Sequence, residues 1–400
     1  MKEITQIEYL FPEILDVEQM TNHRPLVPFE SHIVEMLNSL SQSLLKDRLS
    51  RFYPDVVTFA FFCRKANLLK LKDEYLNNDR VRLGRGLVFH IAPSNVPINF
   101  GYSLVAGLLS GNVNIVRVSS KPFPQVDLIV KHLKQIAEEH PIAKERIGVV
   151  RYEHTSNANE VFSALCHVRI IWGGDNTIAT LREYPIPPRA FDICFADRYS
   201  IAALNADALL NENNMSKLAE RFYNDTYLFD QNACSAPHLV LWTGTEENII
   251  KAKEIFWKAV HQYASIHYAN FQEVMAVDKL TTMYLQAVDL QVKDESYETN
   301  ILRRVNLQTL PVNIDNYRCA GGYFTEYSAK SLDEMAPIIK NKYQTLAYYG
   351  YDCEVWKEFV LKNRIVGIDR IVPLGETTAF SLTWDGYNLI DQLTRIVSII

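Results

Sequence analysis

Apolar residues recur at helical spacing through the first part of the chain, and prolines interrupt the pattern at Pro25, Pro28 and Pro54. The clearest series comprises Ile33, Met36, Leu37, Leu40 and Leu44. This spacing predicts that residues 1–82 form a mainly helical part packed on the domain that follows. We find no chemical motif in it.

From Leu83 the pattern changes to short β-rich runs that alternate with helical segments. The runs LVFHI, VNIVRV, IGVVRY and VRIIW are separated by segments such as INFGYSLVAGLL and PQVDLIVKHLKQIAEE. Strands of five or six residues alternating with longer helices are typical of βαβ units, which build a parallel sheet. We therefore predict a doubly wound, nucleotide-sized α/β domain over residues 83–205.

A second α/β domain is predicted over residues 206–365. It begins with a helix from Met215 to about Phe229, followed by the loop DQNACSAP, the strand HLVLW and a long amphipathic helix from about Glu246 to His261. The final segment, residues 366–400, is predicted to close a cleft between the domains.

Composition and charge limit the classes of function. The 400 residues are 48% hydrophobic and 22% charged, which is ordinary for a globular protein, and 41 basic against 47 acidic residues give a net charge of −6. This mild negative charge argues against nucleic acid as a partner. The six cysteines show no C-x-x-C pair, so neither a zinc site nor a disulfide framework is indicated. With no signal peptide and no run of ~18 apolar residues, we expect a cytoplasmic protein without a membrane span.

The first candidate site is the turn HIAPSNVPINF, between a predicted strand and a predicted helix. Such turns lie at the ligand-binding edge of a parallel sheet. Asn95 stands between Pro93 and Pro97, which restrict the loop and could fix the orientation of the amide. Asn95 is therefore either a donor for a developing oxyanion or a loop residue that caps its own helix.

Two further strand ends carry polar groups. Arg117 lies near the end of the run VNIVRV, and Ser119 and Ser120 follow it; a cation and hydroxyls there suit a phosphate, although a solvated strand edge is the alternative. Gly173 and Gly174 follow the run VRIIW, where their backbone could approach a pyrophosphate, or could form a tight turn with Asp175 as N-cap. The GxGxxG fingerprint of a standard dinucleotide site is absent.

Cys234 is the cysteine most suited to chemistry. It lies in a loop among small and polar neighbours, whereas Cys63 and Cys166 lie within apolar runs typical of inert core thiols. A loop cysteine without function is the alternative.

In this order and at these separations, the motifs resemble the aldehyde dehydrogenase superfamily, and more closely the LuxC-type acyl-CoA reductases. The resemblance runs from about Leu83 to Arg395 and includes the blocks GLVFHIAPSNVPINF, LLSGNVNIVRVSS, DQNACSAP, KYQTLAYYG and GIDRIVPLGETTAFSLTWDGYNLI. It implies an aldehyde-dehydrogenase-like fold, with a cofactor domain over residues 83–205 and a catalytic domain over residues 206–365.

The resemblance also implies residue roles. Cys234 would be the acyl-accepting nucleophile, and Asn95 the side-chain half of an oxyanion hole completed by the Cys234 backbone N–H. The cofactor would be NADPH, because Ser120 falls where NAD-preferring members have a glutamate, whose charge would repel a 2′-phosphate. The residues implied to bind the cofactor are Ala92, Pro93, Ser94, Arg117, Ser119, Ser120, Gly173, Gly174 and Thr177. No metal is implied.

One departure from the superfamily pattern concerns the glutamate that activates water in aldehyde-oxidising members. The corresponding stretch is FDICFADRYS, with Cys194 or Phe195 at the glutamate position and Asp192 and Asp197 as possible substitutes. Loss of that base agrees with a reductase, because water attack would discard the activated acyl group.

The implied reaction is therefore reduction of an acyl thioester to an aldehyde through a thioacyl-cysteine. The acyl donor would be acyl-CoA or an acylated partner protein, and the resemblance further implies a homo-oligomer, with an acyl-activating ligase subunit as a possible partner. The alternatives are an aldehyde-oxidising dehydrogenase, a non-redox cysteine acyltransferase or thioesterase with His238 as base, and a catalytically inactive scaffold that docks an acyl-activating partner. Binding of a nicotinamide cofactor separates the reductase and the dehydrogenase from the non-redox cysteine enzyme.

Overall fold

The computed structural model describes residues 4–76, 80–269, 271–295 and 299–399. The chain divides into two compact units, residues 1–196 with 387–400 and residues 197–386, and each is described by itself. The change of unit falls at residue 197, so that strand β8 (Tyr199–Asn205) belongs to the second unit, and only the last 14 residues of the predicted C-terminal segment belong to the first.

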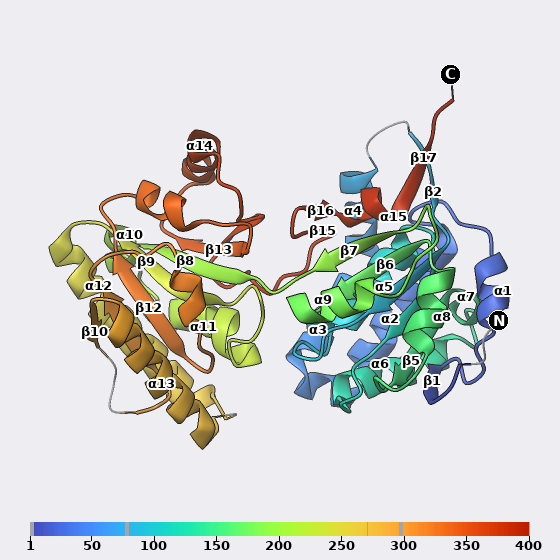
Figure 1. Ribbon diagram of the computed structural model, residues 1–400, viewed down its shortest axis with the longest axis horizontal. Coiled ribbons are helices and arrows are strands. Elements are labelled where there is room, and N and C mark those ends of the chain that lie inside the picture. The colour runs from blue at the N-terminus through green and yellow to red at the C-terminus, as the bar shows by residue number, and fades with distance from the viewer. Residues whose placement is uncertain (1–3, 77–79, 270, 296–298, 400) are drawn as a thin grey trace. The chain divides into compact units, whose positions relative to one another are not determined.

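The first unit is built on a six-stranded sheet with the order β1-β5-β4-β3-β6-β7 (Figure 1). Its strands are β1 (Ile7–Phe11), β3 (Leu87–Ile91), β4 (Val113–Arg117), β5 (Ile147–Tyr152), β6 (Val168–Trp172) and β7 (Phe191–Phe195). A separate antiparallel ribbon joins β2 (Val81–Gly84) to β17 (Thr394–Val397). The helices are α1 (Val17–Asn22), α2 (Ser31–Lys46), α3 (Pro54–Phe62), α4 (Lys65–Tyr75), α5 (Asn99–Leu109), α6 (Pro124–Ile136), α7 (Ile142–Arg146), α8 (Ala158–Leu165), α9 (Asp175–Arg182) and α15 (Leu389–Leu393).

The predicted βαβ pattern is confirmed for this sheet. Strands β5, β4, β3, β6 and β7 are mutually parallel, and their apolar runs are buried because helices cover both faces. Phe89 on β3 packs with residues of α1, α8 and α9, whereas its neighbour His90 points to the opposite face, toward Ser103 of α5. The helical spacing predicted from Ile33 to Leu44 is also confirmed, since α2 buries all five residues.

The mainly helical prediction for residues 1–82 misses two strands. Residues Ile7–Phe11 form β1, which pairs antiparallel with β5 at the edge of the sheet, and Val81–Gly84 form β2. Each takes its partner from more than 100 residues away along the chain, so local spacing carried no signal of the pairing.

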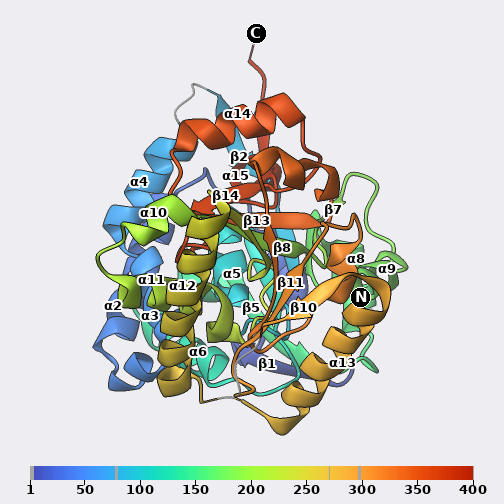
Figure 2. The same cartoon turned by 90° about the vertical axis from the view of Figure 1, so that its left-hand side faces the viewer.

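The second unit contains a seven-stranded sheet with the order β10-β11-β12-β9-β8-β13-β14 (Figure 2). Besides β8, its strands are β9 (Pro237–Thr243), β10 (Val292–Asp294), β11 (Arg303–Leu307), β12 (Tyr323–Ser328), β13 (Tyr343–Tyr349) and β14 (Arg370–Pro373). Its helices are α10 (Ala206–Leu210), α11 (Met215–Thr226), α12 (Glu246–His267), α13 (Glu273–Asp289) and α14 (Cys353–Asn363). The short strand β15 (Thr383–Trp384) also lies in this unit, whereas β16 (Tyr387–Asn388) belongs to the first unit.

Both faces of this sheet are buried in cores of their own. Along β9, Val240 and Trp242 face the core under α11 and α12, whereas Leu239 and Leu241 face the core that includes Trp356 of α14. Alternation of side chains along a strand gives each face its own apolar set, which explains why the sequence shows continuous apolar runs here.

Candidate functional site

The first unit brings three of the predicted segments to one edge of its sheet. Strands β3, β4 and β6 are parallel neighbours, and the predicted residues lie at or after their carboxyl ends. Residues 92–95 follow β3, residues 117–120 end and follow β4, and residues 173–177 follow β6 and enter α9. The ligand edge of a doubly wound sheet lies at the carboxyl ends of its strands, so this edge can hold a dinucleotide.

The loop after β3 is hydrogen-bonded to β4 at its first residue and is exposed to solvent two residues later. The Ala92 backbone N–H donates to the Arg117 carbonyl oxygen at 3.0 Å, and Ala92 is buried, whereas Ser94 and Asn95 are exposed. Helix α5 begins at Asn99, and its N-cap residue is Ile98, with no capping hydrogen bond from that side chain. Asn95 therefore does not occupy the N-cap position that the alternative interpretation gave it.

The stretch after β4 presents cationic and hydroxyl groups without a carboxylate. The Arg117 guanidinium lies 5.5 Å from the centre of the Tyr152 ring, and its Nη2 donates to the Tyr152 carbonyl at 3.4 Å. Ser119 is buried and its Oγ accepts from the Lys121 backbone N–H at 3.2 Å, while Ser120 is half-buried. Cationic and hydroxyl groups of this kind at the end of a strand suit a phosphate, as the sequence predicts.

The glycine turn after β6 borders open space. A Cβ atom added at Gly174 would meet nothing within 4 Å, whereas one at Gly173 would lie 3.1 Å from the Thr177 side chain. Gly174 is the N-cap of α9 and Asp175 is its first residue, so the predicted alternative with Asp175 as N-cap is wrong. The open backbone here leaves room for a ligand to approach, which fits the cofactor interpretation.

The stretch aligned with the superfamily glutamate offers no free carboxylate in the first unit. Phe195 stacks on Trp172 with ring centres 3.7 Å apart, and Arg182 Nη2 donates to Cys194 Sγ at 3.5 Å. Asp192 is held by Arg169 through two hydrogen bonds of 2.8 and 3.0 Å.

In the second unit, Cys234 lies in the loop between α11 and β9. This loop is anchored by Gln231, which is fully buried and makes four hydrogen bonds. Its Nε2 donates to the Pro237 and Tyr323 carbonyl oxygens, and its Oε1 accepts from the Gly322 and Tyr323 backbone N–H groups. The loop that carries Cys234 is thereby joined to residues 318–323, which precede and begin β12.

Cys234 is half-buried, and its own carbonyl oxygen accepts a hydrogen bond of 2.6 Å from Ser200 Oγ. Burial raises the pKa of the thiol. Against this, a backbone hydrogen bond from Arg198 and the charge of Arg318 both lower that pKa, while the charges of Asp197 and Asp385 raise it.

Arg318 belongs to an ionic group that the sequence did not reveal. Its Nη1 donates to Asp197 Oδ1 at 2.8 Å and to the Arg198 carbonyl at 2.9 Å, and Lys342 Nζ lies 3.3 Å from Asp197 Oδ2. Burial raises the pKa of Asp197, but the charges and hydrogen bonds of Arg318 and Lys342 outweigh burial and hold that pKa below its ordinary value. Asp197 is thus a paired carboxylate and a poor general base. In the sequence around Arg318, only the Gly-Gly pair at residues 321–322 indicates a loop.

His238 has a structural role in this unit. It is buried, stacks on Tyr199, and its Nδ1 donates to the Cys319 carbonyl at 3.0 Å. Burial lowers the pKa of His238 to about 3, so the ring is neutral. Among the hydrogen bonds of the described residues, none joins His238 to Cys234, which argues against the histidine as base for a cysteine hydrolase.

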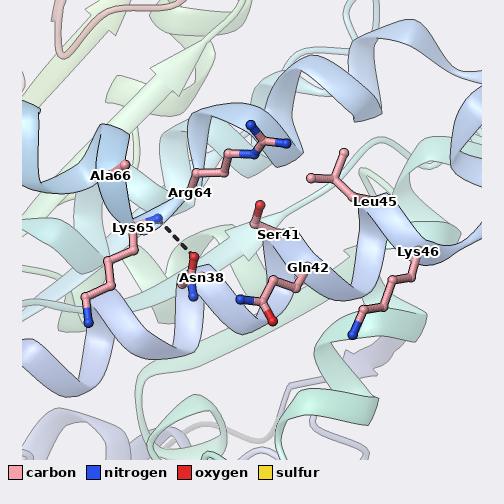
Figure 3. A pocket seen from close by; sticks show the side chains of 8 residues that line it. All are labelled: Asn38, Ser41, Gln42, Leu45, Lys46, Arg64, Lys65 and Ala66. Atoms are coloured by element: carbon pink, nitrogen blue, oxygen red, sulfur yellow. Dashed lines mark hydrogen bonds between the residues drawn. The ribbon is translucent and has the colours of Figure 1, made fainter.

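Two surface cavities of about 420 Å³ each lie away from these residues. One lies in the first unit between α2 and the start of α4, where Asn38 Oδ1 accepts from the Lys65 backbone N–H at 3.0 Å (Figure 3). The other, in the second unit, is lined by α14 with Tyr348 and Ile371. In the described parts of the chain, no cluster of three or more metal-binding side chains occurs, and no helix is both long and apolar enough to cross a membrane.

A family model described as Acyl-CoA reductase (LuxC) matches residues 14–396. The long-chain acyl-protein thioester reductase of Vibrio harveyi is 25% identical over 320 residues, which cover 78% of this chain and 64% of the relative. The protein of the same name from Photorhabdus laumondii is 23% identical over 340 residues, covering 82% and 67%. The chain thus spans about two thirds of the length of these curated relatives.

Solved structures show the same fold at low sequence identity. An indole-3-acetaldehyde dehydrogenase complexed with NAD+ matches with a TM-score of 0.66 and 12% identity, covering 96% of this chain and 86% of that one. A Thermus thermophilus 1-pyrroline-5-carboxylate dehydrogenase matches with a TM-score of 0.64 and 12% identity, covering 95% and 82%. These matches confirm the predicted aldehyde-dehydrogenase-like fold.

Proposed function

Because this chain belongs to the acyl-CoA reductase (LuxC) family, we propose that it reduces a long-chain acyl thioester to the aldehyde through a thioacyl-cysteine at Cys234. The acyl donor in this proposal is acyl-CoA or an acylated partner protein. The observation that carries the proposal is the setting of Cys234 itself: a half-buried cysteine, in a hydrogen-bonded loop, near the charge of Arg318.

In the acyl-transfer step, Cys234 Sγ forms a bond to the thioester carbonyl carbon while the bond from that carbon to the donor sulfur breaks. The donor leaves as a thiolate. We assign the side chain of Asn95 and the backbone N–H of Cys234 as donors to the negative charge that develops on the carbonyl oxygen. When the acyl carbon has been reduced, its bond to Sγ breaks, the aldehyde departs and Cys234 is again a thiolate, which is a good leaving group.

A nicotinamide cofactor, when bound, supplies the hydride for this reduction. We assign its binding to the edge formed by Ala92, Pro93, Ser94, Arg117, Ser119, Ser120, Gly173, Gly174 and Thr177. NADPH is preferred over NADH in this proposal, because residues 117–121 contribute two cations and two hydroxyls but no carboxylate that would repel a 2′-phosphate.

The absence of a free carboxylate at the superfamily glutamate position supports the reductive direction. Phe195 and Cys194 are apolar or weakly polar, Asp192 is bound by Arg169, and Asp197 is paired with two cations. Within these residues no group is poised to activate water, so the acyl group on Cys234 is preserved for reduction.

The test is acyl labelling followed by product analysis. Incubation with radioactive palmitoyl-CoA should label the protein stoichiometrically, and Cys234→Ala should abolish the label, whereas Cys319→Ala, which removes another half-buried thiol of the same unit, should retain it. Addition of NADPH should release the label as aldehyde, identified by mass spectrometry, with NADH less effective. Label that persists in Cys234→Ala, or release of free acid, would contradict the proposal.

A further inference from the structure

Helix α13 of the second unit buries polar side chains and exposes apolar ones. Its two fully buried side chains are Lys279 and Gln286, while Val277 is 62% exposed and Val288 is 83% exposed. The exposed apolar side chains form one stripe along the helix, which comprises Val274, Val277, Leu280, Tyr284, Leu285 and Val288. In both ribbon views α13 is a long helix beside β10 (Figures 1 and 2). An apolar stripe that extends over four turns differs from the single exposed apolar residues normal on protein surfaces.

The inward-facing groups fix this orientation. Lys279 Nζ donates to the Asn300 carbonyl at 2.7 Å, and Gln286 Nε2 donates to Thr325 Oγ1 at 3.0 Å. Gln286 Oε1 also accepts from the Tyr323 hydroxyl. Rotating α13 to bury its apolar stripe would break these bonds and leave the buried hydroxyl groups of Thr325 and Tyr323 unpaired. The stripe is therefore held outward by the fold.

The stripe has the spacing of a helix-pairing seam. Val274, Val277, Thr281, Tyr284 and Val288, which we call the outer seam, follow one another at intervals of three, four, three and four residues. This is the spacing of the a and d positions of a coiled coil, and all three a positions are β-branched. The single polar member costs little, because Thr281 Oγ1 already donates to the Val277 carbonyl at 2.9 Å. The seam thus suits another helix rather than a strand or an extended peptide.

The charges beside the outer seam indicate what kind of helix would pair with it. The exposed ionic residues of α13 are Glu273, Asp278 and Asp289, all acidic, and its one basic residue, Lys279, is buried. In a parallel pair of two copies, Glu273 would face Asp278 of the other copy, five residues along. Parallel self-pairing is therefore repulsive, whereas lysines or arginines flanking the seam of a different helix would be attracted.

We propose that the outer seam of α13 is the docking site for an amphipathic helix of a partner protein, whose apolar seam is flanked by basic residues. The proposal rests on this helix alone and is independent of the proposed catalytic function.

The test uses two synthetic helical peptides with the same apolar a and d residues, one with lysine and one with glutamate at the flanking positions. In fluorescence anisotropy with the full chain, the lysine peptide should bind at least 10-fold more tightly than the glutamate peptide, and less tightly at high salt. Val277→Glu should weaken its binding at least 10-fold. Ile250→Glu on α12, at a side chain equally exposed at 62%, is the matched control and should leave binding unchanged.

Four results would overturn the proposal. The first three are failure of the lysine peptide to bind, equal binding of the two peptides, and the same loss of binding in Ile250→Glu as in Val277→Glu. The fourth is that Val277→Glu abolishes either self-association of the chain, seen by sedimentation, or its capture by phosphatidylcholine vesicles, seen by flotation. The occupant of the outer seam would then be a second copy of the chain or a lipid surface. Val277 is exposed, so circular dichroism should show that Val277→Glu folds normally.

Discussion

At the scale of single residues, Arg318 contributes to the ionisation of Cys234. Burial raises the pKa of the thiol, and the backbone hydrogen bond from Arg198 and the charge of Arg318 oppose this. Replacement of Arg318 by Met removes that charge while keeping much of the apolar stem, so the pKa of Cys234 should rise further. The measurement is the pH dependence of iodoacetamide alkylation at Cys234, followed by mass spectrometry of its peptide.

A control for this prediction is Lys357→Met on α14, which removes an exposed lysine paired with Glu354 in the same unit. Its alkylation profile should match that of the parent chain. If Arg318→Met also leaves the profile unchanged, Arg318 holds only Asp197 and the Arg198 carbonyl, and another group activates the thiol.

His90 is a second residue whose protonation is set by its surroundings. It lies fully buried on β3, with Nδ1 2.8 Å from Ser103 Oγ and Nε2 3.0 Å from Asn114 Oδ1, and burial lowers its pKa to about 4. Between about pH 6.5 and pH 4 the unfolded chain binds a proton that the folded chain does not. The free energy of unfolding should therefore fall as the pH falls through this window, by about 2–3 kcal/mol at pH 4.5 from this group.

Urea unfolding from pH 7 to pH 4.5 tests this contribution. His90→Gln should lose less stability over the window than the parent chain, although it is less stable at pH 7, and the exposed His154→Gln should behave like the parent. The comparison between variants is needed because Asp225 and Asp385, whose pKa values burial raises to about 6, contribute with the opposite sign. Parallel curves for His90→Gln and the parent would contradict the assignment.

At the scale of elements, Gln231 connects the loop that carries Cys234 to the loop before β12. Gln231→Ala would leave two carbonyl oxygens and two N–H groups of these loops without their partner, and we expect a loss of roughly 3 kcal/mol in unfolding free energy. Hydrogen exchange at Gly322 and Tyr323 should accelerate. The exposed Gln308→Ala, in the same unit, should change neither quantity; unaltered exchange in Gln231→Ala would show that the loops are held by other contacts.

The same loops show what sequence could and could not predict. Cys234 could be singled out because its small, polar neighbours differ from the apolar runs around Cys63 and Cys166, and its catalytic role stays a prediction. Arg318 was not, because it is 84 residues from Cys234 in the sequence and its neighbours give no charge pattern. The strands from β3 to β6 were predictable from their local alternation with helices, whereas β1 depends on a partner, β5, that only the folded sheet supplies.

At the scale of the whole molecule, the two units differ in how the chain builds them. The first unit combines residues 1–196 with residues 387–400. Strand β17 pairs with β2, Asn112 Nδ2 donates to the Leu393 carbonyl and Arg85 Nε donates to the Gln392 carbonyl. The second is a single continuous stretch, residues 197–386, with a sheet buried on both faces. The partners that tune Cys234, namely Arg198, Arg318, Asp197 and Asp385, all belong to that stretch.

A fragment of residues 197–386 should therefore fold alone, and its Cys234 should alkylate with the same pH midpoint as in the full chain. The reason is that both the hydrophobic cores and the ionic group are internal to it. Residues 1–386, by contrast, lack α15 and β17 and should lose stability in the first unit while keeping this midpoint. Cooperative thermal unfolding by circular dichroism and the alkylation profile provide the two measurements. A fragment that folds but shows a shifted midpoint would mean that residues outside 197–386 contribute to the ionisation of the nucleophile.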